Sequence, residues 1–208
     1  MRKLFLLLAL AAIVAGCSSE PEKKEGEATP KPEAKKLSYE TGRVAFQKTF
    51  ISARGWAADA QPYRLESQYT KDAPVNTGKC GVWKAVFASV SHRASKPFTW
   101  SGVSEDDAPA PGVSGAAEDD FNPSNQNTQP FDLAFLKQDS DKAFQVAQAH
   151  GGEKIMKADP KQPVIYMLDW WPKENKLKWH VIYGSDLDTA KLRVAVDATT
   201  GEFLKVEK

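Results

Sequence analysis

The alternation of residues in the segment 176–184 constrains the fold of this chain more than any other feature. The segment reads KLKWHVIYG, and large residues that favour burial recur at every second position: Leu177, Trp179, Val181 and Tyr183. Because successive side chains of a strand point to opposite faces of a sheet, this pattern predicts a β-strand that buries one face. The other side would hold Lys178, His180 and Ile182, and we expect His180 to be exposed there.

Similar segments lie on both sides of this one, and short turns separate several of them. The segment GVWKAVFAS at 81–89 has the same form, with Trp83 among the residues of its apolar side. Further strand candidates are residues 62–70, 97–103, 164–171, 191–198 and 202–206. The turns PKENK, SDLD and DATTGE carry residues that favour chain reversal. Such short connections favour an antiparallel meander.

Two segments have the rough apolar spacing of a helix. The first is ETGRVAFQKTFISARGW at 40–56, where Gly55 is a plausible stop. The second is DSDKAFQVAQAHGG at 139–152. Asp139 or Ser140 can cap its N-terminus, and the glycine pair 151–152 can end it. We expect each helix to cover one face of a sheet.

The order of these elements occurs twice, which predicts an internal duplication. The tripeptide AFQ at 45–47 recurs at 143–145, and Trp83 recurs as Trp179 at nearly the same separation. The predicted fold class is therefore α+β, with two helix-plus-antiparallel-sheet units in tandem. The first unit spans 39–103 and the second 131–208. Residues 104–130 between them are rich in Pro, Gly, Asn and acidic residues, as in a linker loop.

The N-terminus has the pattern of a bacterial export signal. Arg2 and Lys3 precede an apolar run of signal-peptide length, which is too short to span a bilayer as a stable helix. The run ends in VAGC, which resembles a lipobox. That resemblance implies removal of residues 1–16 and lipidation of Cys17, whose acyl chains would hold the protein on a membrane. No aspartate follows Cys17, and by resemblance to enterobacterial sorting this indicates the outer membrane, facing the periplasm.

The segment that follows Cys17 predicts a disordered tether. Glutamate, lysine and proline dominate residues 18–36, and no large apolar residue occurs among them. Such a composition cannot bury enough apolar surface to offset the entropy of ordering. We therefore assign residues 17–38 to the lipid anchor and its linker. The folded part would stand off the membrane surface at the end of this spacer.

The C-terminal segment resembles the end of a PepSY-type domain. In that family a strand ending in a pair such as Tyr-Gly precedes a hairpin of the form V-x-V-D-x-x-T-G-x-x-L. Here HVIYG is followed by KLRVAVDATTGEFLKV, in which Asp197 can bond turn amides and Gly201 can reverse the chain. The first unit departs further from this pattern. The resemblance implies a secreted or membrane-attached protein, and an association with the restraint of peptidases.

Signals for catalysis or for metal binding are absent from the sequence. There is no G-x-S-x-G, phosphate-binding or dinucleotide motif, and His92, His150 and His180 lack the spacing of a zinc site. The acidic clusters 105–107 and 118–120 could bind calcium but lack EF-hand spacing, so we interpret them as a solvated linker. We therefore expect no enzyme activity and no cofactor. The formal net charge of +1 without a basic cluster argues against nucleic acid as a partner.

The cysteine content leaves no partner for Cys80. Cys17 is assigned to the lipid, so no intramolecular disulfide is expected. In an oxidising envelope, Cys80 is either buried and inert, which we favour, or available for mixed disulfides.

The candidate binding residues are Trp170 and Trp171. They are adjacent in a strand candidate, so their rings must point to opposite faces and both cannot enter the core. An exposed tryptophan is a typical anchor of an interface. The leading hypothesis is therefore a non-catalytic envelope lipoprotein that binds a protein or peptide, with a peptidase as one candidate. The alternative is a lipoprotein that binds a small ligand such as a lipid, glycan or cofactor.

Overall fold

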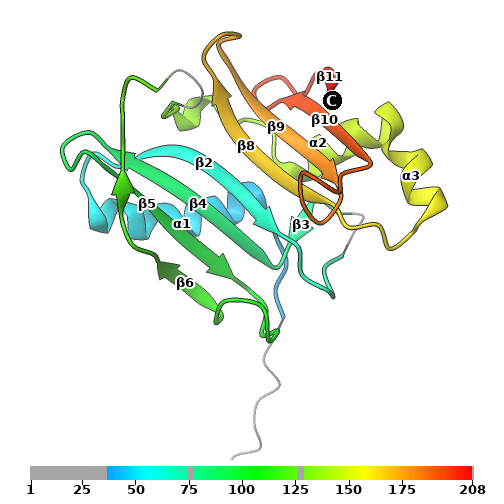
Figure 1. The fold of residues 1–208 in the computed structure, drawn as a ribbon, viewed down its shortest axis with the longest axis horizontal. Coiled ribbons are helices and arrows are strands. Elements are labelled where there is room, and N and C mark those ends of the chain that lie inside the picture. The colour runs from blue at the N-terminus through cyan, green and yellow to red at the C-terminus, as the bar shows by residue number, and fades with distance from the viewer. Residues whose placement is uncertain (1–36, 75–76, 126–128, 208) are drawn as a thin grey trace, which may run out of the picture. The chain divides into compact units, whose positions relative to one another are not determined.

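The computed structural model describes residues 37–207, apart from 75–76 and 126–128. The predicted signal peptide 1–16, Cys17 and most of the predicted tether lie outside the described residues. In the described part, the elements form an α+β domain of helices on a large antiparallel sheet (Figure 1).

The first helix, α1 (Gly42–Trp56), forms where the apolar spacing predicts it. Its buried residues recur every three or four positions, so one stripe of the helix faces the sheet. The second helix, α2 (Ser140–Ala147), begins at the predicted cap, because the Asp139 carboxylate accepts a hydrogen bond from the Ser140 amide. The expected end at the glycine pair is wrong. Gly151, at φ +110°, makes a kink within 148–152, and the helix resumes as α3 (Glu153–Ala158).

The large sheet has nine strands, and every pairing in it is antiparallel. The first half of the chain supplies β2 (Gln61–Gln68), β4 (Val82–Ser89), β5 (Ala94–Ser101), β6 (Gly112–Gly115) and β7 (Asp119–Asp120). The second half supplies β8 (Ile165–Trp171), β9 (Lys176–Tyr183), β10 (Leu192–Asp197) and β11 (Phe203–Glu207). The order is β11-β10-β9-β8-β2-β4-β5-β6, with β7 also beside β5, and β1 (Glu40–Thr41) pairs separately with β3 (Lys79–Cys80).

The two halves of the chain share one continuous sheet. Their first strands, β2 and β8, pair at its centre, and each half then adds strands outward as a meander. The segment 104–130, expected to be a linker loop, contributes β6 and β7 to the outer part of the sheet. The predicted hairpin of the second half is confirmed. Asp197 accepts hydrogen bonds from the Thr199 and Thr200 amides, and Gly201 has φ +80°.

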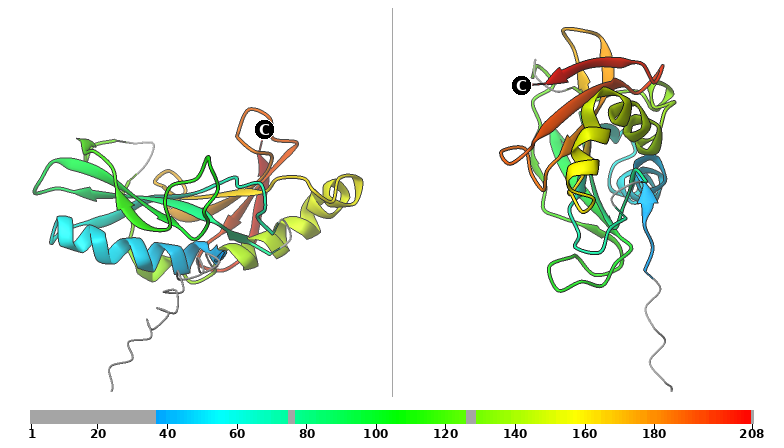
Figure 2. Two further views of the ribbon diagram at one scale, coloured as in Figure 1. Left: turned by 90° about the horizontal axis from the view of Figure 1, so that it is seen from below. Right: turned by 90° about the vertical axis from the view of Figure 1, so that its right-hand side faces the viewer.

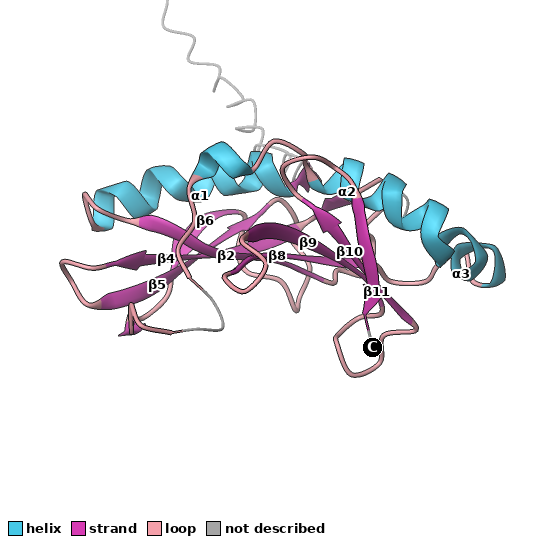
Figure 3. Cartoon of the chain, turned by 90° about the horizontal axis from the view of Figure 1, so that it is seen from above, coloured by secondary structure: helices cyan, strands magenta, loops and turns pink. Residues whose placement is uncertain are grey.

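All three α-helices lie on the same face of this sheet, so the core is the layer between them and the strands (Figures 2 and 3). Trp83 and Trp179 are fully buried there, as the alternation predicts, and their rings meet edge to face at 6.3 Å. Each indole donates to a backbone carbonyl just before a helix: Trp83 to Glu40 at 3.0 Å, and Trp179 to Gln138 at 2.9 Å. No α-helix of the described part covers the opposite face, called the open face below.

The N-termini of α1 and α2 meet above the two tryptophans and are capped by the same two residues. Asp139 caps its own helix and also accepts from the Arg43 amide at 2.8 Å, while the Ser140 hydroxyl accepts from the Gly42 amide at 2.9 Å. Thr41, which precedes α1, makes no side-chain cap. The helix approaches the core closely here, since a Cβ on Gly42 would lie 2.5 Å from the Trp179 ring. The start of α1 therefore depends on residues of the other half.

Candidate functional site

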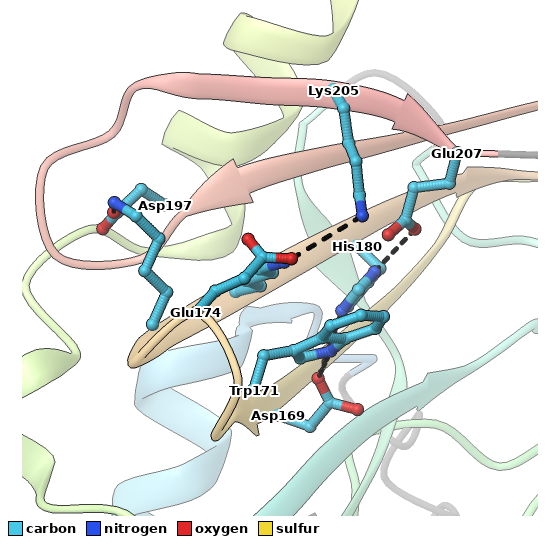
Figure 4. Close-up of polar contacts among 9 residues, drawn as sticks. Asp169, Trp171, Glu174, His180, Asp197, Lys205 and Glu207 are labelled. Atoms are coloured by element: carbon cyan, nitrogen blue, oxygen red, sulfur yellow. Dashed lines mark hydrogen bonds and ion pairs between the residues drawn. The ribbon is translucent and has the colours of Figure 1, made fainter. Parts of the chain in front are cut away.

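The open face carries a cluster of charged side chains around a buried histidine (Figure 4). The imidazole of His180, on β9, lies between two carboxylates. Nδ1 is 2.7 Å from Glu207 Oε2 on β11, and Nε2 is 3.1 Å from Asp169 Oδ1 on β8. Three strands are thus tied across the sheet by one side chain. We call these three residues the histidine triplet.

The prediction that His180 is exposed is wrong, because its residue retains only 2% of its accessible surface. The neighbours Lys178 and Ile182, on the same side of β9, are buried too. Burial by itself lowers the pKa of His180, but hydrogen bonds and charge from Asp169 and Glu207 outweigh it and raise the pKa to about 8. The imidazole is therefore positively charged at neutral pH and forms an ion triplet with the two carboxylates.

Trp171 covers this triplet from the solvent side and remains half-buried. Its indole nitrogen donates to Asp169 Oδ1 at 2.8 Å, and its ring lies 5.9 Å from the His180 ring. Lys178 Nζ lies 4.1 Å and Lys205 Nζ 5.0 Å from the Trp171 ring centroid, within the range of cation–π attraction. Trp171 is thus held in a fixed orientation by one hydrogen bond and two ammonium groups.

Trp170 points to the other face, as adjacent strand residues must. It packs against the hydrophobic core and against Phe135, with ring centroids 5.0 Å apart. Phe135 belongs to the short 3₁₀ turn Leu133–Phe135. The structure therefore separates the two candidate residues: Trp171 belongs to the open face and Trp170 to the helix side.

Two grooves lie on the open face, and the first of them adjoins the histidine triplet. The first, with a volume of about 490 Å³, lies beside His180 and Trp171 and reaches Arg193 and Leu187. The second, of about 580 Å³, lies over β2 and the start of β8 and includes Arg64 and Asp186. Both are lined by Met167 and Leu187, so these two residues separate them. Leu187, in the loop between β9 and β10, keeps 46% of its surface exposed.

The geometry of the histidine triplet favours a structural role over a chemical one. Its two carboxylates bind opposite nitrogens of the imidazole, so they cannot converge on a common ion. Within the described ranges, no group of three or more His, Cys, Asp or Glu residues is placed to hold a metal. In the acidic cluster 118–120, Glu118 accepts a hydrogen bond from the Trp56 indole at 2.7 Å.

The remaining cysteine, Cys80, is a free thiol and is buried, as predicted. Burial raises the pKa of its thiol to about 12. A thiol with this pKa is scarcely ionised at neutral pH, so it is a weak nucleophile.

Together, the fold and the site define an α+β domain with helices on one sheet face and a charged, grooved surface on the other. No protein-family model and no curated protein matches the chain. Among solved structures, it is similar to a candidate lipoprotein (CD1622) from Clostridium difficile 630. That likeness has a TM-score of 0.47 at 14% identity, and it covers 85% of this chain and 95% of the other. None of the described helices is long and apolar enough to cross a membrane.

Proposed function

We propose that the protein is a non-catalytic lipoprotein of the bacterial cell envelope that binds a protein or peptide through the open face of its sheet. The observation that carries this proposal is the position of Trp171. A large aromatic ring, held rigidly and half-buried beside the first groove, lies on a sheet face that no described helix covers. Rigid aromatic anchors of this kind contribute strongly to protein interfaces.

The proposal that the protein is not an enzyme rests on the same site. His180 is the best-placed acid–base group on the open face, yet both of its nitrogens are bound to carboxylates and it is buried. A general acid or base must reach the proton of a substrate, directly or through one water. We therefore assign His180 to the framework that orients Trp171.

A duplicated, PepSY-like plan is part of this proposal. Each half has a helix followed by antiparallel strands in the same order, and each has an indole that donates to a carbonyl two residues before its helix. The confirmed hairpin at Asp197 and Gly201 agrees with the PepSY resemblance of the second half. From this resemblance we propose that the partner is a peptidase and that the protein restrains it.

From the sequence we propose that Cys17 carries the lipid anchor. We also propose that this anchor holds the protein on the outer membrane, facing the periplasm. We expect Cys17→Ala to move the protein from the membrane pellet to the soluble fraction, because its acyl chains would be lost. Cys80→Ala is the matched control and should leave the protein in the pellet. Fractionation with immunoblotting measures both, and unchanged sedimentation of Cys17→Ala would contradict the anchor.

For partner binding, we expect Trp171→Ala to reduce recovery of the partner from envelope extract by about tenfold or more, as for a central interface residue. Ile51→Ala is the control, since this side chain is 76% exposed on α1 and lies away from the open face. Trp170→Ala should leave recovery unchanged once its folded fraction is corrected for lost core contacts. Quantitative pull-down measures recovery, and equal recovery with Trp171→Ala would refute the role of the open face.

The two grooves support a second candidate function, the binding of a small ligand. Their volumes of about 490 and 580 Å³ fall within the usual range for ligand sites. A thermal-shift screen of lipids, glycans and cofactors separates the two functions, because a ligand that binds only the folded state raises the melting temperature. A stabilising ligand whose effect Trp171→Ala abolishes would favour this second function.

A further inference from the structure

We propose that the groove beside Arg193 binds an acidic side chain of a peptide, with an apolar neighbour of that side chain packing on Leu187 and Met167. This inference rests on the proposed function, because it names the chemistry of the partner at the same open face. It is carried by three observations: an arginine that has no ionic partner among the described residues, carboxylates that are already occupied, and an exposed apolar wall.

Arg193 is the first of these observations. It is half-buried on β10 and lines the groove, and in the strand register it lies between Ile182 of β9 and Glu207 of β11. Throughout the described part of the chain, no carboxylate forms an ion pair with its guanidinium. A guanidinium presents a planar fork of donors that fits a carboxylate in a bidentate manner. An anionic group in the groove would therefore find an unused binding element.

The nearest carboxylate does not fill this role, because another group holds it. Glu207 is directly opposite Arg193 in the ladder, yet its carboxylate accepts from His180 Nδ1 at 2.7 Å. Lys205 adds a second cation to the groove, and its only ionic contact among the described residues is Glu174, at 3.8 Å. The histidine triplet thus withdraws negative charge from Arg193 and leaves the groove complementary to an acidic ligand.

The walls of the groove favour an acidic group attached to an apolar one. Leu187 is 46% exposed, and the half-buried Met167 lies between the first groove and the second. Singly exposed apolar residues are common, but these line one groove beside a half-buried tryptophan. A peptide with an acidic residue next to Leu, Val or Phe satisfies both the charge and the apolar walls.

The position of β11 favours a peptide as the occupant. Among the described strands, β11 is the last at one end of the sheet and pairs with β10 alone. Its outer edge therefore presents backbone donors and acceptors to which an extended peptide can add as a further strand. A peptide bound along this edge passes close to Lys205 and Glu207, which line the groove.

A selection from a random peptide library on the full-length protein in detergent micelles tests this inference. We expect peptides selected by the wild type to be enriched in Asp or Glu beside an apolar residue. Arg193→Gln should raise the Kd of a selected peptide by about ten- to hundredfold, as should replacing its acidic residue with the amide. The two changes together should cost little more than either alone, because they remove the same contact. Arg54→Gln, on α1, is the matched control and should leave the Kd unchanged.

The outcomes separate this inference from the proposed function. Selected peptides without acidic enrichment that still require Trp171 would leave the proposed function in place and overturn the role of Arg193. Equal binding by the Arg193→Gln and Arg54→Gln variants would have the same meaning. If no peptide is recovered above the library background, both proposals fail. Arg193-dependent binding of the Cys17→Ala protein to phosphatidylglycerol vesicles, without peptide binding, would indicate a lipid headgroup and overturn the inference.

Discussion

Trp179→Ala is expected to lower the free energy of unfolding by about 3–5 kcal/mol, the largest effect of any single substitution proposed here. The Trp179 side chain is fully buried and packs edge to face on Trp83 at 6.3 Å. Removing it leaves a large cavity beneath the starts of α1 and α2. It also leaves the Gln138 carbonyl without the indole donor, and an unpaired buried acceptor carries a further cost.

Chemical denaturation monitored by far-UV circular dichroism measures this loss. Trp179→Phe should recover much of the stability, because it fills most of the cavity but does not restore the hydrogen bond. Ile51→Ala, at an exposed helix position, should change the stability by less than about 0.5 kcal/mol. A loss below about 1 kcal/mol in Trp179→Ala would show that the two halves do not depend on this contact.

Raising the pH from 6 to 9 is expected to reduce stability by about 2 kcal/mol through His180 alone. Its pKa is raised from 6.5 to about 8 in the folded protein by Asp169 and Glu207, against the opposing effect of burial. Below pH 6.5 both the folded and the unfolded chain hold the proton, so the stabilisation is complete. Between pH 6.5 and 8 only the folded chain keeps it, and as the pH rises through 8 the stabilisation is lost.

Urea unfolding at a series of pH values between 6 and 9 tests this expectation. Other charged groups face the same cluster and also affect stability: Lys178, Lys205, Asp169, Glu174 and Glu207. The measured quantity is therefore the change in stability with pH, and not the stability at one pH. His180→Gln should flatten the profile, although it also lowers stability at every pH. His92→Gln, at an exposed position, should keep the wild-type slope. A wild-type profile that is flat from pH 6 to 9 would contradict the charged state of His180.

Residue alternation and turn chemistry predicted most of the sheet, because both are properties of a short stretch of chain. The strand candidates around Trp83 and Trp179 and the hairpin at Asp197 were found in this way. The kink at Gly151 was not, because a glycine with positive φ can end a helix or join two helices. Which occurs depends on the packing of the residues that follow.

The site was only half predictable for a related reason. Because adjacent residues of a strand point to opposite faces, the sequence correctly predicted that Trp170 and Trp171 lie on different faces of the sheet. The burial of His180 depends instead on Trp171 and Glu207, which belong to two other strands of the sheet. The periodicity of one strand does not show what neighbouring strands place above it. The sequence did not single out Arg193, because its lack of an ion pair among the described residues follows from the bond between Glu207 and His180.

The shared caps of α1 and α2 bear on how the chain acquires its structure. The first turn of α1 is completed by Asp139 and Ser140, nearly a hundred residues later in the chain. The amino-terminal half therefore cannot complete the capping of its helix before the carboxy-terminal half is present. Its structure is completed only when the other half arrives, so both halves should form and lose their order as one cooperative unit.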